Sequence, residues 1–268
     1  MILFPDLLQL PHQLRHPEVR DLAWVILAPP MLAGTPWPQR HPLAGSDWVQ
    51  APERLEHWLR QLDQDSYGLL HWLAQARTRR LGLYYERLWQ FAVKHAPGIE
   101  LIGANMPIRR EGHTLGELDM LLRDRDGVHH LELAIKLYLG PQNGDGHDTA
   151  QWLGPGCHDR LDRKLAHLSQ HQLPISARPE SAKCWRRWIS GSSVRTCGWA
   201  AICSIHGRGQ RRPRAARIHN TCAVAGCIKR IGRNLSGKVR PVAGNPCPAT
   251  PGWRRRTTPP SRLGVPGS

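Results

Sequence analysis

Four ionisable residues interrupt an apolar, hairpin-like stretch, GELDMLLRDRDGVHHLELAIK, at residues 116–136. They are Glu117, Asp119, Glu132 and Lys136. A carboxylate at a core-facing strand position is costly unless another group pairs with it. A divalent metal ion is one such partner. The ordinary alternative is an exposed sheet face that leaves these acids in water.

Alternation along a strand places Glu117 and Asp119 on one face, and Glu132 and Lys136 on one face of the next strand. If the two strands pair through the turn that ends at Gly127, Asp119 and Glu132 become neighbours. Two carboxylates with waters suit Mg²⁺, which can activate a water for attack on a phosphodiester. Lys136 would orient that water or stabilise the transition state; its alternative role is to snorkel at a strand end. Glu117 is either an extra ligand or a surface acid.

Periodicity predicts the elements that would position these residues. A helix at 51–62 is followed by a longer one that Gly98 ends and whose single apolar stripe is Leu81, Tyr84, Tyr85, Leu88 and Ala92. Three strands are predicted at 99–108, 116–123 and 128–139. A glycine-rich loop, 140–156, is either a lid or a plain connection, and it precedes a helix at 158–172. Tyr84, Tyr85 and Trp89 are expected in the core rather than as a platform for stacking bases.

The last of these helices carries a stripe of basic side chains opposite its leucines: Arg160, Lys164, His167 and His171. The stripe is either a set of phosphate contacts or a solvated face, because Asp159 and Asp162 beside it partly cancel the charge. Upstream, the apolar run at 22–34 is too short to span a bilayer and is broken by two prolines. It is expected to be a buried element.

The helix, the DG hairpin and the following acidic strand resemble the PD-(D/E)XK nuclease-like core. The resemblance implies that Asp119 and Glu132 are metal ligands and that Glu86 is the helix glutamate. The lysine departs from that pattern, because Ala134 occupies the position two residues after Glu132. Lys136 lies one pleat further on the same face, about 6.6–7 Å away. In the other alignment Lys136 is in register and Ala134 replaces the acid.

A second resemblance covers roughly residues 20–176. The stretches RDLAWVILAPPML, RLGLYYERLWQFAVKH, HTLGELDMLL, HLELAIKLYLG and WLGPGCHDRLDRKLAHLSQHQLP resemble, in this order, the bacterial family designated domain of unknown function 1853. The family's biochemistry is not established, so this resemblance implies a fold more than an activity. It ends near Ile175.

The formal net charge of +16 is concentrated in the last third of the chain. Residues 1–180 hold 19 basic and 21 acidic side chains, whereas residues 181–268 hold 18 basic ones, no acidic ones and six of the seven cysteines. Three interpretations of this tail compete: a disordered basic arm that binds nucleic acid, a zinc module, or a sequence read out of frame. The zinc pattern would use Cys203, His206, His219 and Cys222, with Cys227 nearby.

These observations predict an α/β protein in which a helical N-terminal part packs on a small mixed sheet, followed by an irregular basic tail. The expected parts are residues 1–76, a nuclease-like core at 77–176, and the tail at 177–268. The predicted function is Mg²⁺-dependent cleavage of DNA or RNA. Asp119 and Glu132 would hold the metal, Lys136 and Glu86 would assist, and Arg160 and Lys164 would contact phosphate. The alternative is a non-catalytic module that binds nucleic acid or protein.

The sequence also predicts a location. Residues 1–180 contain one cysteine, Cys157, and no signal peptide is recognised, so we expect the protein in the cytoplasm.

Overall fold

The acidic hairpin lies within a twisted sheet in the computed structural model of this chain. The structure describes residues 2–30, 32, 35, 37–76, 80–141, 146–154, 158–185 and 195–205, and of 184, 185 and 195–205 it describes only the backbone. All these residues fall within one compact unit, Met1–Gly237.

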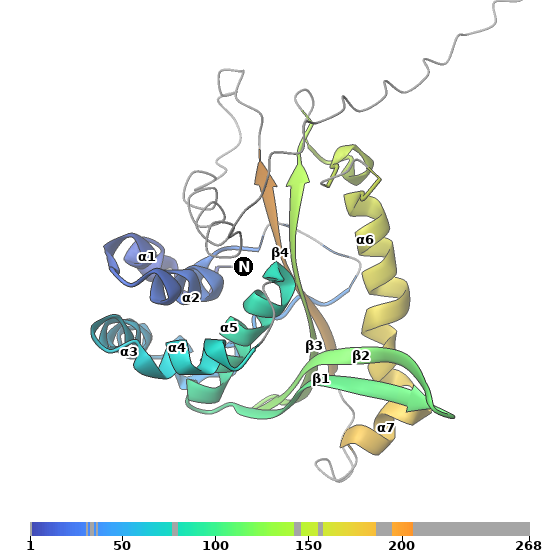
Figure 1. The fold of residues 1–268 in the computed structure, drawn as a ribbon, viewed down its shortest axis with the longest axis horizontal. Coiled ribbons are helices and arrows are strands. Elements are labelled where there is room, and N and C mark those ends of the chain that lie inside the picture. Colours follow the sequence, from blue (N-terminus) through green and yellow to red (C-terminus); the bar gives the residue numbers. More distant parts are fainter. Residues whose placement is uncertain are drawn as a thin grey trace, which may run out of the picture. The chain divides into compact units, whose positions relative to one another are not determined.

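The sheet contains four described strands in the order β1-β2-β3-β4. β1 (Glu100–Arg110), β2 (His113–Asp124) and β3 (Gly127–Leu139) form an antiparallel meander, as the sequence predicts. β4 (Arg195–Ile205) joins β3 in parallel, so the sheet is mixed. The β1–β2 hairpin turns away from β3 at the lower end of the sheet (Figure 1).

Helical elements surround this sheet along most of the described chain. In sequence order they are η1 (Pro5–Leu7), α1 (Leu10–Gln13), α2 (Pro17–Leu27), η2 (Asp47–Val49), α3 (Pro52–Gln64), α4 (Tyr67–Ala74), α5 (Leu81–His95), η3 (Thr149–Gln151), α6 (Leu161–His167), the π-helical η4 (Leu168–Gln172), η5 (Leu173–Ala177) and α7 (Pro179–Trp185). Proline occupies the first turn of α2 and of α3, where its missing N–H costs nothing. The structure therefore confirms an α/β fold in which helices pack on a small sheet.

One hydrophobic core joins the N-terminal helices to the sheet. The apolar run that begins at Leu22 becomes α2, whose Val19, Leu22 and Ile26 are buried together with Leu133 of β3. Tyr85 and Trp89 of α5 are also buried in this core, as predicted. Burial of such side chains contributes about 1.5–3 kcal/mol each. The helices at residues 10–95 and the sheet thus stabilise one another.

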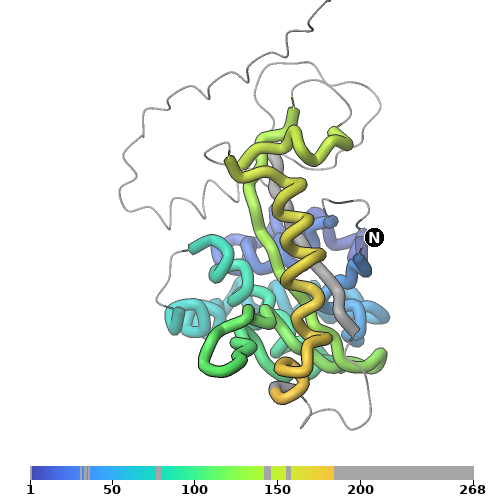
Figure 2. The backbone as a smooth tube through the Cα atoms, turned by 90° about the vertical axis from the view of Figure 1, so that its right-hand side faces the viewer, coloured from blue at the N-terminus to red at the C-terminus, as the bar shows by residue number. Residues whose placement is uncertain are grey.

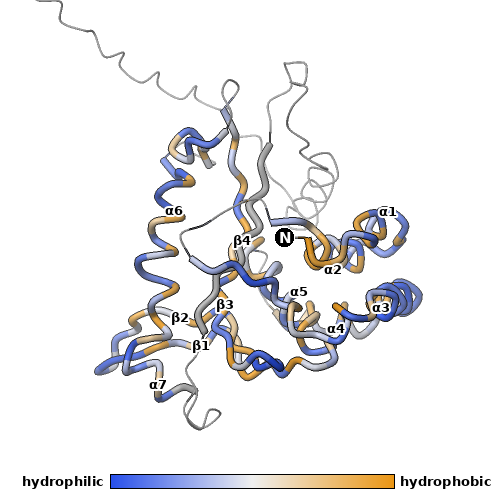
Figure 3. Tube along the Cα trace, turned by 180° about the vertical axis from the view of Figure 1, so that it is seen from behind, coloured by the Kyte–Doolittle hydropathy of each residue, from blue (hydrophilic) through white to orange (hydrophobic). Residues whose placement is uncertain are grey.

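The helices cover the sheet from two sides. α1 to α5 lie on one side of β3 and β4, and α6 lies on the other (Figure 1). After rotation by 90°, α6 and its continuation through η4 run lengthwise along β3 (Figure 2). Hydrophobic residues predominate in α2, whereas α6 is mainly hydrophilic (Figure 3). The polar α6 therefore faces the part of the sheet that carries the acidic residues.

Two regular elements lie within the segment that the sequence analysis assigns to the tail. α7 and β4 both lie after residue 176, and β4 extends the sheet. The sequence of β4 has no charged residue from 196 to 205. Averaging the charge over residues 181–268 concealed this local pattern. The remaining residues of the zinc pattern, from His206 onward, lie outside the described residues.

No helix in the described part of the chain is long and apolar enough to cross a membrane.

Truncation of Leu55 tests the shared core. This α3 side chain is fully buried in the cluster that also holds β3 residues. We expect Leu55→Ala to lower the free energy of unfolding by about 2–5 kcal/mol, measured by urea denaturation of the full chain. Tyr67→Ala, at a side chain that is 74% exposed, is the control and should change it by less than about 0.5 kcal/mol. Equal effects of the two substitutions would contradict this packing.

Candidate functional site

The site begins where β2 separates from β3. The ladder between these strands ends at the pair Met120 and Leu131. One residue further, the Asp119 Oδ2 atom accepts a hydrogen bond from the Leu133 backbone N–H at 2.9 Å. The carboxylate thus replaces a backbone acceptor that the diverging strand no longer supplies, which fixes its position next to β3.

Glu132 lies on β3, and its side chain is fully buried. Its two oxygens each have a hydrogen-bond partner: Oε1 contacts His130 Nε2 at 2.7 Å and Oε2 accepts from Gln172 Nε2 at 2.8 Å. Lys164 Nζ in turn donates to Gln172 Oε1 at 2.8 Å. Side chains from β3, α6 and η4 therefore form one polar chain, Lys164–Gln172–Glu132–His130.

His130 is an unusual member of this chain. Its side chain is fully buried, and burial lowers its pKa to about 4, so the imidazole is neutral near pH 7. Within the described residues its Nδ1 atom has no hydrogen-bond partner. A buried polar atom without a partner costs about 1–3 kcal/mol.

Glu86 approaches from the opposite side of the sheet, on α5. Asn105 of β1 donates to Glu86 Oε2 at 2.8 Å, and Gln90 Nε2 donates to Asn105 Oδ1 at 2.8 Å. Asn105 has φ of 51°, in the left-handed region that Asn tolerates better than most residues. The irregular backbone at this point of β1 thus presents an amide to the helix glutamate.

Three carboxyl groups have raised pKa values here. Burial raises the pKa of Asp119 to about 7, and the Glu132 carboxylate adds to the rise. Burial also raises the pKa of Glu132 to about 7, although its contacts with Asp119 and the charge of Lys164 oppose this. Burial raises the pKa of Glu86 to about 7, with a further contribution from Asp119. The three groups are close enough for their charges to interact, as predicted for Asp119 and Glu132 from the hairpin.

The two lysines occupy different environments. Lys136 Nζ lies 3.2 Å from Asp159 Oδ2, and Tyr138 donates to the other oxygen of that carboxylate at 3.3 Å. Burial and the nearby Lys136 lower the pKa of Lys164, while Asp119 and Glu132 oppose this effect. Lys164, one of the two predicted phosphate contacts, is thus part of the carboxyl cluster, whereas Lys136 is paired outside it.

The other predicted residues lie around the cluster. Glu117 is exposed on β2. Arg160 is paired with Asp162, its Nε donating to Oδ1 at 2.9 Å. In the basic stripe, His167 and His171 are exposed. The described part of the loop folds back, because Leu139 and Leu153 exchange backbone hydrogen bonds.

A divalent metal ion would find oxygen ligands here. No three described His, Cys, Asp or Glu side chains lie together as a ready-made metal site. Mg²⁺, however, commonly uses one or two carboxylates and keeps several waters, and carboxylate oxygens are its preferred ligands. Asp119 and Glu132 fit such a site, because each oxygen that accepts one hydrogen bond retains a second lone pair.

The sequence interpretation missed three polar residues of this cluster: Asn105, His130 and Gln172. His130 was detectable, because it lies two residues before Glu132 and therefore on the same face of the strand. Gln172 reaches Glu132 only because the chain continues from α6 into a π-helical turn, which the sequence does not reveal. Asn105 depends on the irregularity of β1.

The comparison with known families gives one match. The model of the family described as domain of unknown function (DUF1853) matches residues 20–208. This range extends past Ile175, where the resemblance was expected to end, and it includes α7 and β4. No curated protein and no solved structure matches the chain.

The raised pKa values predict that stability falls with rising pH. The folded protein retains protons that the unfolded chain, with carboxyl pKa values of 3.8 for Asp and 4.5 for Glu, has released. Their stabilising contribution is complete below the unfolded values and is lost as the pH rises through about 7. We expect this contribution to the free energy of unfolding to fall between about pH 4 and about pH 7, while the neutral buried His130, whose pKa is lowered from 6.5 to about 4, opposes the fall below about pH 6.5.

Asp119→Asn should reduce this loss, since it removes one of the carboxyl groups and keeps an oxygen acceptor for Leu133 N–H. Urea denaturation at a series of pH values measures the effect. Glu111→Gln, at a side chain 83% exposed on the β1–β2 turn, is the matched control and should leave the pH dependence unchanged. If the wild-type protein instead gains stability as the pH rises over this range, the carboxyl groups are ionised in the folded state and stabilised by their partners, which contradicts the prediction.

Proposed function

This chain belongs to the DUF1853 family, for which no activity is described, and we propose that it is a metal-dependent nuclease or a relative that retains the same site. One observation carries the proposal. Carboxyl groups from α5, β2 and β3, namely Glu86, Asp119 and Glu132, gather beside Lys164 in a partly buried position. Such a concentration of acids costs stability, which is typical of functional sites.

The metal would be held by Asp119 and Glu132. When bound, Mg²⁺ supplies charge neutralisation at a phosphoryl group and an activated water. His130 and Gln172 hold the Glu132 carboxylate in a fixed orientation, as partners of a metal ligand typically do. Glu86 adds a third negative charge close to Asp119.

Lys164 takes the role that the sequence assigns to Lys136. Its Nζ uses one donor on Gln172 and retains two for phosphate oxygens. In this proposal Lys164, which lies on α6, replaces the strand lysine of the nuclease-like pattern, and the displaced position of Lys136 needs no other explanation.

A specific observation favours the alternative, a non-catalytic module that binds nucleic acid or protein. Both oxygens of Glu132 already have protein partners, so the group is satisfied without a metal. Asp119 likewise has a backbone donor. In this case the buried polar chain would serve the fold, and Asp119→Asn would leave binding intact.

A cleavage assay distinguishes the two functions. We expect the full chain to cut single-stranded DNA, duplex DNA or RNA in the presence of MgCl₂ or MnCl₂ and to lose this activity in EDTA. Asp119→Asn should lower the rate by on the order of 100-fold, because it removes a metal ligand and its charge. Glu111→Gln, at a side chain 83% exposed on the β1–β2 turn, is the matched control. Binding of nucleic acid that persists in EDTA and in Asp119→Asn, without cleavage by any form, would instead establish the module.

The two lysines can be compared within the same assay. Lys164→Gln should lower the cleavage rate by about 100-fold, since a charged donor at the reacting phosphate is worth several kcal/mol. Lys136→Gln should lower it less than about 5-fold, because the pairing with Asp159 keeps this side chain away from the acids. If Lys136→Gln lowers the cleavage rate more than Lys164→Gln does, Lys136 is the lysine that acts at the phosphate.

A further inference from the structure

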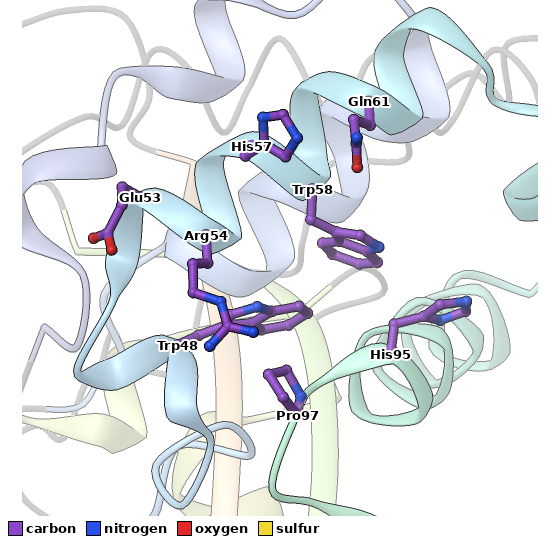
Figure 4. Close-up of a pocket in the computed structure, with 8 residues that line it drawn as sticks. All are labelled: Trp48, Glu53, Arg54, His57, Trp58, Gln61, His95 and Pro97. Carbon is purple, nitrogen blue, oxygen red and sulfur yellow. The ribbon is translucent and has the colours of Figure 1, made fainter.

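A hollow lies away from the carboxyl cluster, between α3 and the end of α5. This pocket has a volume of about 600 Å³. Its lining residues are Trp48, Glu53, Arg54, His57, Trp58, Gln61, His95 and Pro97. Four of the eight carry aromatic rings. Figure 4 shows that Trp58 projects from α3 and His95 from the end of α5, and that Arg54 also projects from α3.

The aromatic rings are stacked with small tilts. The Trp48 and Trp58 centroids are 4.9 Å apart with an angle of 32°, and those of Trp58 and His95 are 5.7 Å apart, also at 32°. Trp48 is buried, Trp58 is half-buried and His95 is exposed. The buried Phe91 also contacts both rings, with centroids 6.1 Å from Trp58 and 4.2 Å from His95, and holds them in place. A flat aromatic guest can stack on the surface of Trp58 and His95 that lines the pocket.

Three polar side chains of the pocket have no hydrogen-bond partner among the described residues. Arg54, His57 and Gln61 are exposed and have no side-chain hydrogen bond or ion pair with any described residue. Arg60 on the same helix differs, because it is paired with Glu56 and also donates to Gln13. The pocket thus presents a guanidinium, an imidazole and an amide to a ligand, with Glu53 at its edge turned away from the rings (Figure 4).

We propose that this pocket binds a nucleotide unit, with the base stacked on Trp58 and His95 and the phosphate at Arg54. Aromatic side chains can stack on any base, because every base has a π-face. The Arg54 guanidinium can bind a phosphate through two N–H groups. The Gln61 amide, with donors and an acceptor, can pair with the edge of a base. The unit is either a free nucleotide or one residue of a single strand. The inference does not rest on the proposed nuclease activity.

Titration calorimetry with the full chain measures nucleotide binding at this pocket. EDTA is included so that no metal-dependent cleavage can occur. We expect AMP to bind saturably, adenosine to bind more weakly, and inorganic phosphate not to bind detectably. Arg54→Gln should weaken AMP about 10-fold and leave adenosine unchanged. Arg60→Gln, on the same helix but outside the pocket, is the control and should change neither.

A single-stranded oligoadenylate decides between the two sources. Binding at least about 10-fold tighter than AMP identifies a strand as the ligand, and equal affinity identifies a free nucleotide. Trp58→Ala should weaken AMP and adenosine alike, and circular dichroism verifies that this half-buried substitution leaves the fold intact. The proposal is overturned if AMP does not saturate below about 5 mM, or if Arg54→Gln and Arg60→Gln have the same effect. A nucleotide affinity with no nuclease activity would leave this inference standing and reject only the proposed function.

Discussion

Loss of hydration by acids in a partly buried cluster, reinforced by their mutual repulsion, is the constraint on which the site depends. Asp119, Glu132 and Glu86 lose hydration on folding. Among the described lysines, Lys164 is the one whose charge acts on Asp119 and Glu132. Each carboxyl is nevertheless held by a specific donor: a backbone N–H, a glutamine with a histidine, or an asparagine. A cluster that served packing alone would be cheaper with apolar side chains of similar volume.

The sheet geometry makes this cluster possible. Where β2 separates from β3, backbone groups that would pair in a continuous ladder become available to side chains. The core on the α5 side is apolar and rigid, whereas α6 is mainly hydrophilic and contributes Lys164. The acids therefore lie between the apolar core on the α5 side and the hydrophilic helix α6. A small ligand could bind in this position without disturbing the core.

The sequence predicted those features that depend on local pattern. Alternation and the turn at Gly127 were sufficient to bring Asp119 and Glu132 together, and the 3.6-residue period placed Tyr85 and Trp89 in the core. The choice of lysine was not accessible in this way. Whether Lys136 or Lys164 approaches the acids depends on how α6 lies over the sheet and on a pairing with Asp159, 23 residues from Lys136. β4 was missed because a strand of ordinary composition lies within a segment of extreme average charge.

The parallel pairing of β4 with β3 has a practical consequence for laboratory versions of the protein. β3 is an interior strand only because β4 covers its second edge. A fragment that stops at residue 176 would leave the peptide groups of β3 open along that edge, next to an apolar sequence. Such an edge recruits other chains and promotes aggregation. If a shortened chain is insoluble, the reason is that β3 has lost its pairing with β4. A fragment intended to be soluble should therefore extend at least through Ile205.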